Sequence, residues 1–231
     1  MTITNASLRP DFRADLRSSV RDAFLDAAAV LLPVSCAGCG APDRSVCADC
    51  ARALTPEVRL RTVRGVAVWS ALDYDEVPRT VLLAYKEGGR VDTARPLAGA
   101  LTPALAAAAG PPGRGAVPVL IPSTRAAWRR RGYHPTGMVL ARTRVLAPPL
   151  WHALRLTRQT ADQAALGNVQ RSDNRAGSMV ASRRLRGRRC VIVDDIVTSG
   201  ATIAEAARAI RAAGGTVGGA ATIARTPRRR R

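Results

Sequence analysis

The stretch that most constrains the fold begins at Cys190. It opens with four apolar residues, Cys190-Val191-Ile192-Val193, a β-branched run typical of a strand buried on both faces of a parallel sheet. Asp194 and Asp195 follow directly, where we expect this strand to end. The carboxyl ends of parallel strands border the ligand crevice of an open α/β sheet. The stretch therefore predicts an α/β fold with two carboxylates at its binding edge.

A turn of small residues separates the two aspartates from an expected alanine-rich helix. The helix contains Ile203 and Ile210, and the turn consists of Thr198, Ser199, Gly200, Ala201 and Thr202. Such a turn gathers unpaired backbone N–H groups at the positive end of a helix dipole, which favours a phosphate. Carboxylates beside it suit a sugar phosphate, with the acids on the hydroxyls and the amides on the phosphate. A P-loop is excluded, because no Gly-Lys-Ser/Thr follows a spaced glycine.

The run from Cys190 to Thr202 resembles the phosphoribosyl-pyrophosphate (PRPP) motif of type I phosphoribosyltransferases, which has four apolar residues before Asp-Asp-Ile-Val-Thr-Ser-Gly-Ala-Thr. The resemblance implies that Asp194 and Asp195 bind the ribose 2′ and 3′ hydroxyls, directly or through Mg²⁺, and that the turn wraps the 5′-phosphate. It also implies that family's fold, a Rossmann-like, mostly parallel sheet with flanking helices. Another doubly wound domain with acids at a strand end, such as a receiver domain, is the alternative.

Four of the five cysteines form two close pairs, Cys36 with Cys39 and Cys47 with Cys50. Two Cys-x-x-Cys pairs at this spacing suit a tetrahedral Zn²⁺ site, and the zinc is structural because four thiolates leave no open position. Two disulfides are the first alternative, although they are rare in a reducing cytosol. A redox dithiol is the second, although it needs only one pair. Cys190 is expected to be a small core residue.

The net charge of +19 is concentrated in the second half of the chain. Residues 116–231 carry 22 arginines and five acidic residues, and Lys86 is the only lysine in the sequence. A basic surface of this size attracts polyanions such as nucleic acid or polyphosphorylated nucleotides. A merely solvated basic face is the alternative. No apolar run approaches the roughly 18 residues of a membrane span, and the start of the chain is unlike a secretory signal, so we expect a cytoplasmic protein.

The chain divides by composition into four parts. We expect a disordered lead over 1–15, an N-terminal helix and zinc knuckle over 16–60, a phosphoribosyltransferase-like domain over 61–226 and a basic tail over 227–231. Strands are expected within 63–74 and at 117–121, 151–156 and 216–223, and helices at 77–85, 92–109 and 137–145. The second of these helices is expected to be interrupted near Pro96 and Pro103. Residues 157–168 suit a mobile loop that closes over a substrate.

The expected strand at 117–121 ends in a polar turn, Ser123-Thr124-Arg125, and a run of arginines, Arg129, Arg130 and Arg131, follows. In the transferases this place holds the pyrophosphate loop, and arginines there make charge-assisted bonds to the anion. The three later arginines could equally be an exposed basic helix end, or could contact nucleic acid.

Further residues narrow the resemblance. In order after the cysteines they are Tyr85-Lys86 with Gly88, Ile121-Pro122 with Arg131-Gly132-Tyr133, then Arg158, Gln163 and Leu166, then Arg171 and Asn174. This order resembles the ComF family of competence-associated proteins, over about residues 31–225. The resemblance implies a role in DNA uptake or in handling single-stranded DNA beside helicase and recombination partners, with Arg158 on the closing loop and Arg171 as an anion contact. Where that family reads Arg-Gly-Phe-Asn-Gln, this chain has His134-Pro135 after Tyr133, and we expect His134 to be an ordinary surface histidine.

Three functions fit these patterns. The first is an enzyme in which a nucleophile displaces pyrophosphate from C1 of PRPP, with Mg²⁺ and arginines neutralising the leaving group. The sequence does not indicate a pocket for a particular acceptor base. The second is a module that binds a nucleotide or the 5′ end of single-stranded DNA. The third is an interaction protein whose zinc knuckle and N-terminal helix dock a helicase or recombinase, with a simple zinc staple as the plainer interpretation.

Overall fold

The computed structural model describes residues 34–111, 115–146, 152–157 and 177–227. Several predictions fall outside these ranges: the lead over 1–15, the helix before residue 33, the closing loop over 157–168 apart from Thr157, and the arginines of the tail. The same holds for the signature residues Arg158, Gln163, Leu166, Arg171 and Asn174.

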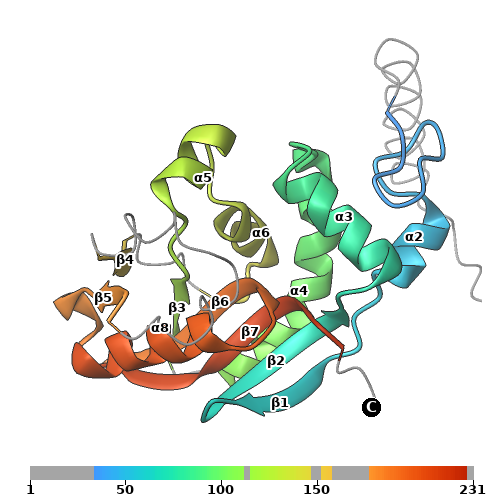
Figure 1. Ribbon diagram of the computed structural model, residues 1–231. Helices are drawn as coiled ribbons and strands as arrows, with labels where there is room; N and C mark the ends of the chain where they lie inside the picture. The colour runs from blue at the N-terminus through green and yellow to red at the C-terminus, as the bar shows by residue number, and fades with distance from the viewer. Residues whose placement is uncertain (1–33, 112–114, 147–151, 158–176, 228–231) are drawn as a thin grey trace, which may run out of the picture.

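A five-stranded sheet forms the centre of the molecule, in the order β1-β2-β7-β6-β3 (Figure 1). Its strands are β1 (Arg59–Val63), β2 (Val66–Asp73), β7 (Thr216–Arg225), β6 (Arg189–Val197) and β3 (Val117–Leu120). Strands β1 and β2 form an antiparallel hairpin, and the pairs β2–β7, β7–β6 and β6–β3 are parallel. This confirms the mixed α/β fold with a mostly parallel sheet that the sequence predicts.

Helices cover both faces of the sheet (Figure 1). The first face packs against α3 (Glu76–Lys86), α4 (Ala94–Ala109) and α6 (Pro135–Thr143), and the second against α8 (Ala201–Ala212). The alternation of β6 explains this arrangement: Val191 and Val193 belong to the first core, whereas Cys190 and Ile192 belong to the second. All four are fully buried, as expected for a strand covered on both sides.

Smaller elements lie around this framework. They are α2 (Ala48–Ala53), the 3₁₀ turns η1 (Val91–Thr93) and η3 (Arg183–Leu185), α5 (Arg125–Arg131), and a two-stranded antiparallel sheet of β4 (Leu154–Leu156) and β5 (Met179–Ala181). Glu205 of α8 holds this small sheet, because its buried carboxylate accepts a hydrogen bond from the Met179 N–H and pairs with Arg208. The strand expected at 151–156 therefore belongs to a separate sheet. In the described part of the chain no helix is both long and apolar enough to span a membrane.

Two sequence predictions are wrong in detail. The helix expected to break near its prolines is one element, α4, with Pro103 inside it. Pro96 lies in the first turn, where its nitrogen needs no partner within the helix, and the fully buried Leu97, Leu101 and Leu105 supply apolar contacts that offset the bond lost at Pro103. Strand β6 also does not end at the aspartates. It continues to Val197 because β7 pairs with it as far as Arg225.

Candidate functional site

Asp194 and Asp195 lie at the edge of the sheet even though β6 continues beyond them. The neighbouring strand β3 ends at Leu120, which pairs with Val193, so from Asp194 onward no strand among the described residues pairs with β6 on that side. Both aspartates are half-buried. The Asp194 Oδ1 accepts the Asp195 N–H at 2.9 Å, and the Asp195 Oδ1 accepts the Ile196 N–H at 2.7 Å. The local backbone therefore fixes the orientation of both carboxylates at the expected edge.

The small-residue turn after β6 adopts the geometry that its sequence predicts. Thr198 and Ser199 are exposed, and Gly200 begins helix α8 with φ 75°, in the left-handed region that favours glycine. The hydroxyl oxygen of Ser199 accepts the Ala201 N–H at 3.4 Å. Thr202, in the first turn of α8, is half-buried. The turn thus places exposed hydroxyls and the amino end of a twelve-residue helix directly beyond the two aspartates.

The β1–β2 hairpin covers this turn. Arg61 donates from Nη2 to the Thr198 carbonyl oxygen at 3.4 Å. Val63 packs so closely on Gly200 that a Cβ there would overlap the valine Cγ1 and lie 3.1 Å from its Cβ. A glycine is therefore required at residue 200 both by its φ and by its neighbour.

Lys86 forms an ion pair with Asp195. Its Nζ lies 2.7 Å from the Asp195 Oδ2, and the two side chains are 23% and 19% exposed. Arg131 fixes the backbone of Lys86, because its Nε donates to the Lys86 carbonyl oxygen at 2.8 Å. Glu87 pairs with both Arg130 and Arg131, at 2.7 and 3.0 Å. The end of α3 is thereby clamped between α5 and the acidic end of β6.

The contacts of Arg130 and Arg131 with Lys86 and Glu87, called the clamp below, give the three arginines of the predicted run different environments. Arg131 is largely buried, with 13% of its side chain exposed, and it stabilises the fold. Arg130 pairs with Glu87 but remains 63% exposed. Arg129 and the neighbouring Trp128 are exposed, the latter at 49%. The three arginines therefore lie together in sequence but have different environments.

The predicted pyrophosphate loop follows β3 on the same edge as the aspartates, since the Ile121 N–H donates to the Val193 carbonyl oxygen at 3.3 Å. Ser123 is half-buried, whereas Thr124 and Arg125 are exposed. Thr124 is the N-cap of α5, and its hydroxyl oxygen accepts the Ala127 N–H at 3.2 Å.

His134 is not an ordinary surface histidine. Its Nδ1 accepts the Gly137 N–H at 3.1 Å and so caps α6, and its Nε2 lies 2.9 Å from the Ile121 carbonyl oxygen. A carbonyl can only accept, so Nε2 carries the proton and the ring is neutral. Burial lowers the pKa of His134 below its ordinary value, although the Ile121 carbonyl and the Asp195 carboxylate oppose this shift. The expectation was wrong because sequence alone does not show that the two ring nitrogens both find backbone partners.

Two tyrosines join the same region to the core. The buried hydroxyl of Tyr85 donates to the Pro135 carbonyl oxygen at 2.8 Å, and the Tyr133 hydroxyl donates to the Tyr85 carbonyl oxygen at 2.9 Å. Their ring centroids are 6.1 Å apart. Burial raises the pKa of the Tyr133 hydroxyl. These contacts fix α3 and α6 relative to each other, so they position Lys86 at the aspartates.

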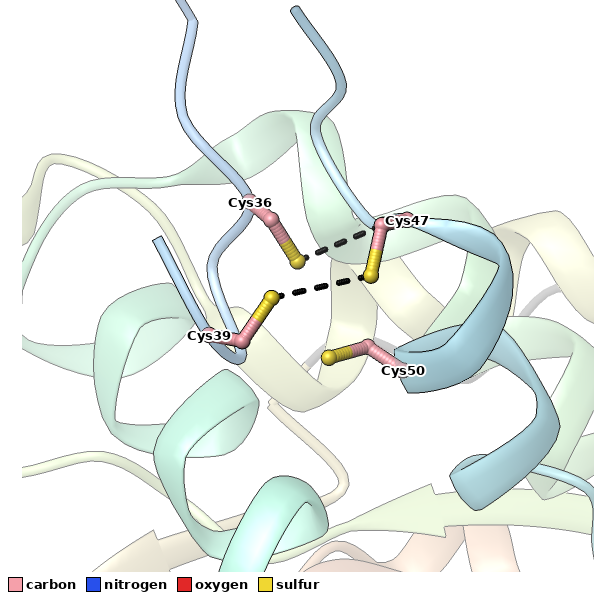
Figure 2. A group of neighbouring side chains, drawn as sticks. All are labelled: Cys36, Cys39, Cys47 and Cys50. Carbon is pink, nitrogen blue, oxygen red and sulfur yellow. Dashed lines mark hydrogen bonds between the residues drawn. The ribbon is translucent and has the colours of Figure 1, made fainter. Parts of the chain in front are cut away.

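Figure 2 shows the four paired cysteines pointing toward one another. Their Sγ atoms all lie within 4.8 Å of each other, and those of Cys39 and Cys47 are 3.6 Å apart. A tetrahedral zinc with bonds of about 2.3 Å has sulfur–sulfur edges of about 3.8 Å. None of the four forms a disulfide. The residues present therefore fit a structural Zn²⁺.

The backbone around Cys36 favours the thiolate form of this cysteine. Burial raises the pKa of the Cys36 thiol, but the backbone N–H groups of Cys47, Cys39 and Gly38 outweigh this and lower it to about 6. Gly38 leaves room for Cys50, since a Cβ at this glycine would lie 2.6 Å from the Cys50 Sγ. The subdomain packs on the first core through Ala37 and Leu54.

A cavity of about 250 Å³ lies elsewhere, at the junction of α2, the hairpin and the start of α3. Its lining includes four carboxylates, those of Glu57, Asp73, Asp75 and Glu76, and one guanidinium, that of Arg59. Such a lining repels phosphates, and it contains no residue of the predicted site. We therefore place the candidate ligand site at the open edge around Asp194 and Asp195 and not in this cavity.

The fold and this edge together define an α/β domain with two adjacent carboxylates and a small-residue turn at the carboxyl end of a parallel sheet. Residues 139–231 match the family model of the phosphoribosyl transferase domain. No curated protein matches the chain. The chain thus contains a phosphoribosyltransferase domain, with a central mostly parallel sheet, flanking helices and an N-terminal cysteine cluster that could bind zinc.

The match begins within α6, so it covers the aspartates and the turn but not the parts that contact them from earlier in the chain. The sequence marks Lys86 only as a signature residue and as the single lysine, and it gives no indication of a role for Arg61. Nothing in the local sequence of β1 signals that an arginine reaches residue 198. For Lys86 the available signal was a lone lysine among 35 arginines.

Proposed function

We propose that this protein binds a 5′-phosphorylated ribose, as PRPP or a nucleotide, at the edge formed by β6 and the start of α8. The observation that supports it best is the two backbone-oriented carboxylates at Asp194 and Asp195 directly before an exposed turn that enters α8 through Gly200. In this proposal the aspartates bind the ribose hydroxyls, and the residues from Thr198 to Thr202 surround the 5′-phosphate. The family match over the same residues supports it.

Mg²⁺ fits the same edge, because carboxylate oxygens are its preferred protein ligands and the half-buried Asp194 and Asp195 are adjacent there. When bound with PRPP, Mg²⁺ would neutralise the pyrophosphate. The chain's own residues then have three tasks: Asp194 and Asp195 orient the ribose, the turn holds the phosphate, and Arg125 lies exposed near the leaving side. Arg158, which lies outside the described residues, keeps its proposed place on the closing loop.

A phosphoribosyl transfer is the proposed reaction. A nucleophile, such as a base nitrogen, forms a bond to C1 of the ribose while the bond from C1 to the pyrophosphate oxygen breaks. The electron pair of that bond leaves with the pyrophosphate. The acceptor base is not identified by any described pocket, so binding is the first property to test.

Isothermal titration of the zinc-loaded protein with PRPP and Mg²⁺ tests the binding. We expect Asp194→Asn and Asp195→Asn to weaken PRPP binding by about tenfold or more, because each removes a charged hydrogen-bond acceptor worth about 1.5–3 kcal/mol. Glu57→Gln is the control, since that carboxylate is 77% exposed and pairs with Arg59 away from the turn. The proposal fails if the wild-type protein binds no PRPP, or if the aspartate variants bind it as well as the control does.

We further propose that α5 gives the protein a second function as a contact for single-stranded DNA, in keeping with the resemblance to the ComF family and its role in DNA uptake. The supporting observation is an exposed Trp128 beside exposed Arg129 and Arg130, which offers a stacking surface within a basic patch. The slope of log affinity against log salt should approach about −0.7 per phosphate neutralised. A flat slope, or unchanged affinity in Trp128→Ala with Arg129→Gln, would count against this function.

A protein partner such as a helicase or recombinase remains the third proposal, through the zinc subdomain. The described contacts favour the plainer role of a staple, because Ala37 and Leu54 of that subdomain are already buried in the first core.

A further inference from the structure

Lys86 is the only lysine in a chain with 35 arginines, and it lies on the carboxylate proposed to bind the ribose. A composition so biased toward arginine makes the one exception informative. Guanidinium groups are broad, planar and suited to bidentate contacts, whereas an ammonium is a compact point charge. Here the Lys86 ammonium makes a single contact of 2.7 Å to one carboxylate oxygen, as a point charge does.

The Asp195 side chain has a partner on each oxygen. The Ile196 N–H donates to Oδ1 at 2.7 Å and the Lys86 ammonium lies 2.7 Å from Oδ2. The first contact comes from the backbone of β6 and is fixed, whereas the second comes from a flexible side chain. A divalent cation that binds Asp195 is repelled by the ammonium at this distance. The two cations therefore compete for the carboxylate.

The rest of the clamp keeps Lys86 in reach whether or not its side chain contacts Asp195. Arg131 binds the Lys86 carbonyl oxygen and not its side chain, and Tyr133 binds the carbonyl oxygen of Tyr85. These bonds hold the end of α3 beside β6. The ammonium can consequently swing away from Asp195 without any loss of the contacts that fix the helix.

We propose that Lys86 and a divalent cation are alternative occupants of the Asp195 carboxylate, so that Lys86 sets the metal affinity of the site. The inference rests on the proposed function in that it treats Asp195 as a ligand-binding carboxylate. Without a ligand the ammonium neutralises Asp195 and keeps metal affinity low. When a cation binds, the released ammonium remains at the same edge and is free to contact an anionic group of the ligand. Metal and phosphorylated ligand then bind cooperatively, and Lys86 is the positioning residue that links them.

Binding of Mn²⁺ alone to the zinc-loaded protein, followed by electron paramagnetic resonance, tests this proposal. The Lys86 ammonium opposes a second cation on the same carboxylate through like-charge repulsion, and solvent screens this repulsion only in part because the two side chains are 23% and 19% exposed. Lys86→Met should therefore tighten Mn²⁺ binding by about tenfold or more. Lys86→Arg, which keeps the charge, should bind Mn²⁺ within about twofold of wild type.

Two further variants separate this effect from others. Arg130→Met removes the same net charge from the same clamp but does not touch Asp195, and should leave Mn²⁺ affinity unchanged. Asp195→Asn in the Lys86→Met background should abolish the gain, which excludes binding in the acidic cavity lined by Glu57 and Asp73. Circular dichroism and urea unfolding confirm that each variant is folded.

The proposal is overturned if Lys86→Met binds Mn²⁺ no more tightly than wild type, if Arg130→Met gains as much, or if no variant binds Mn²⁺ through Asp195. Titration of the zinc-loaded wild-type protein with PRPP and Mg²⁺ tests the proposed function separately. Tightened Mn²⁺ binding in Lys86→Met without any binding of PRPP would leave this inference standing and refute the proposed function. Binding of PRPP without tightened Mn²⁺ binding would support the proposed function and overturn this inference.

Discussion

The contact between Gly200 and Val63 yields the sharpest stability prediction. Replacing Gly200 by alanine forces a side chain into the left-handed region, at φ 75°, which costs about 1–2 kcal/mol. The new methyl group would also overlap Cγ1 of Val63, a residue only 5% exposed, and such overpacking costs about 1–3 kcal/mol. Gly200→Ala should therefore lower the free energy of unfolding by about 2–5 kcal/mol.

Gly65 offers a matched control in the same hairpin. Its φ is 77°, but a Cβ there would meet nothing within 4 Å, so Gly65→Ala should cost only the backbone strain of about 1–2 kcal/mol. Val63→Ala leaves a cavity but removes the clash. The double variant Gly200→Ala with Val63→Ala should therefore be about 1–3 kcal/mol more stable than the sum of the single effects.

Urea unfolding of the zinc-loaded protein, followed by tryptophan fluorescence and circular dichroism, measures all four free energies. The reasoning is refuted if Gly200→Ala is no less stable than Gly65→Ala, or if the effects of Gly200→Ala and Val63→Ala on the free energy of unfolding are additive. Either result would mean that Val63 does not press on the turn, and that the hairpin does not shape the proposed phosphate site.

Three further predictions follow from other contacts. Gly38→Ala should weaken zinc binding, measured by competition with a chromophoric chelator, because its Cβ would lie 2.6 Å from the Cys50 Sγ; unchanged affinity would contradict the four-thiolate site. The pKa of His134 is lowered in the folded protein, so the unfolded chain binds the proton first and the free energy of unfolding should fall as the pH drops below about 6.5. His134→Asn keeps a cap acceptor and should lack that part of the pH dependence in urea unfolding between pH 5 and 8; an identical pH profile would refute the assignment. Glu205→Gln should lower the free energy of unfolding by about 1.5–3 kcal/mol, whereas the exposed Glu57→Gln should have almost no effect, and equal losses would show that the tie to Met179 contributes little.

The sequence predicted the elements that depend on local pattern. The strand at Val191 to Val193 and the helix after Gly200 follow from apolar runs and small residues, and the structure confirms both. The end of β6 was misplaced because a strand's length depends on its neighbours. Pairing of Val197 with Arg225 in β7 extends it beyond the point where β3 stops.

The parts of the site that the sequence could not assign come from long-range contacts. Lys86 and Asp195 are separated by more than 100 residues and meet only because α3 packs against the first face of the sheet. His134 owes its environment to two backbone groups, at Ile121 and Gly137, whose positions depend on how α6 follows β3. Such pairings have no periodicity and no short motif, and no pattern in a single sequence reveals them.

The place of β7 in the sheet has a consequence for synthesis. This strand is the last of the described strands along the chain, yet it lies between β2 and β6. On the ribosome, residues 66–73 and 189–197 are made first and have no shared neighbour until residues 216–225 have left the exit tunnel. We therefore expect the nascent chain to expose two unsatisfied strand edges until then, and a product truncated before residue 216 to be a substrate for chaperones or proteases and not a partly working protein.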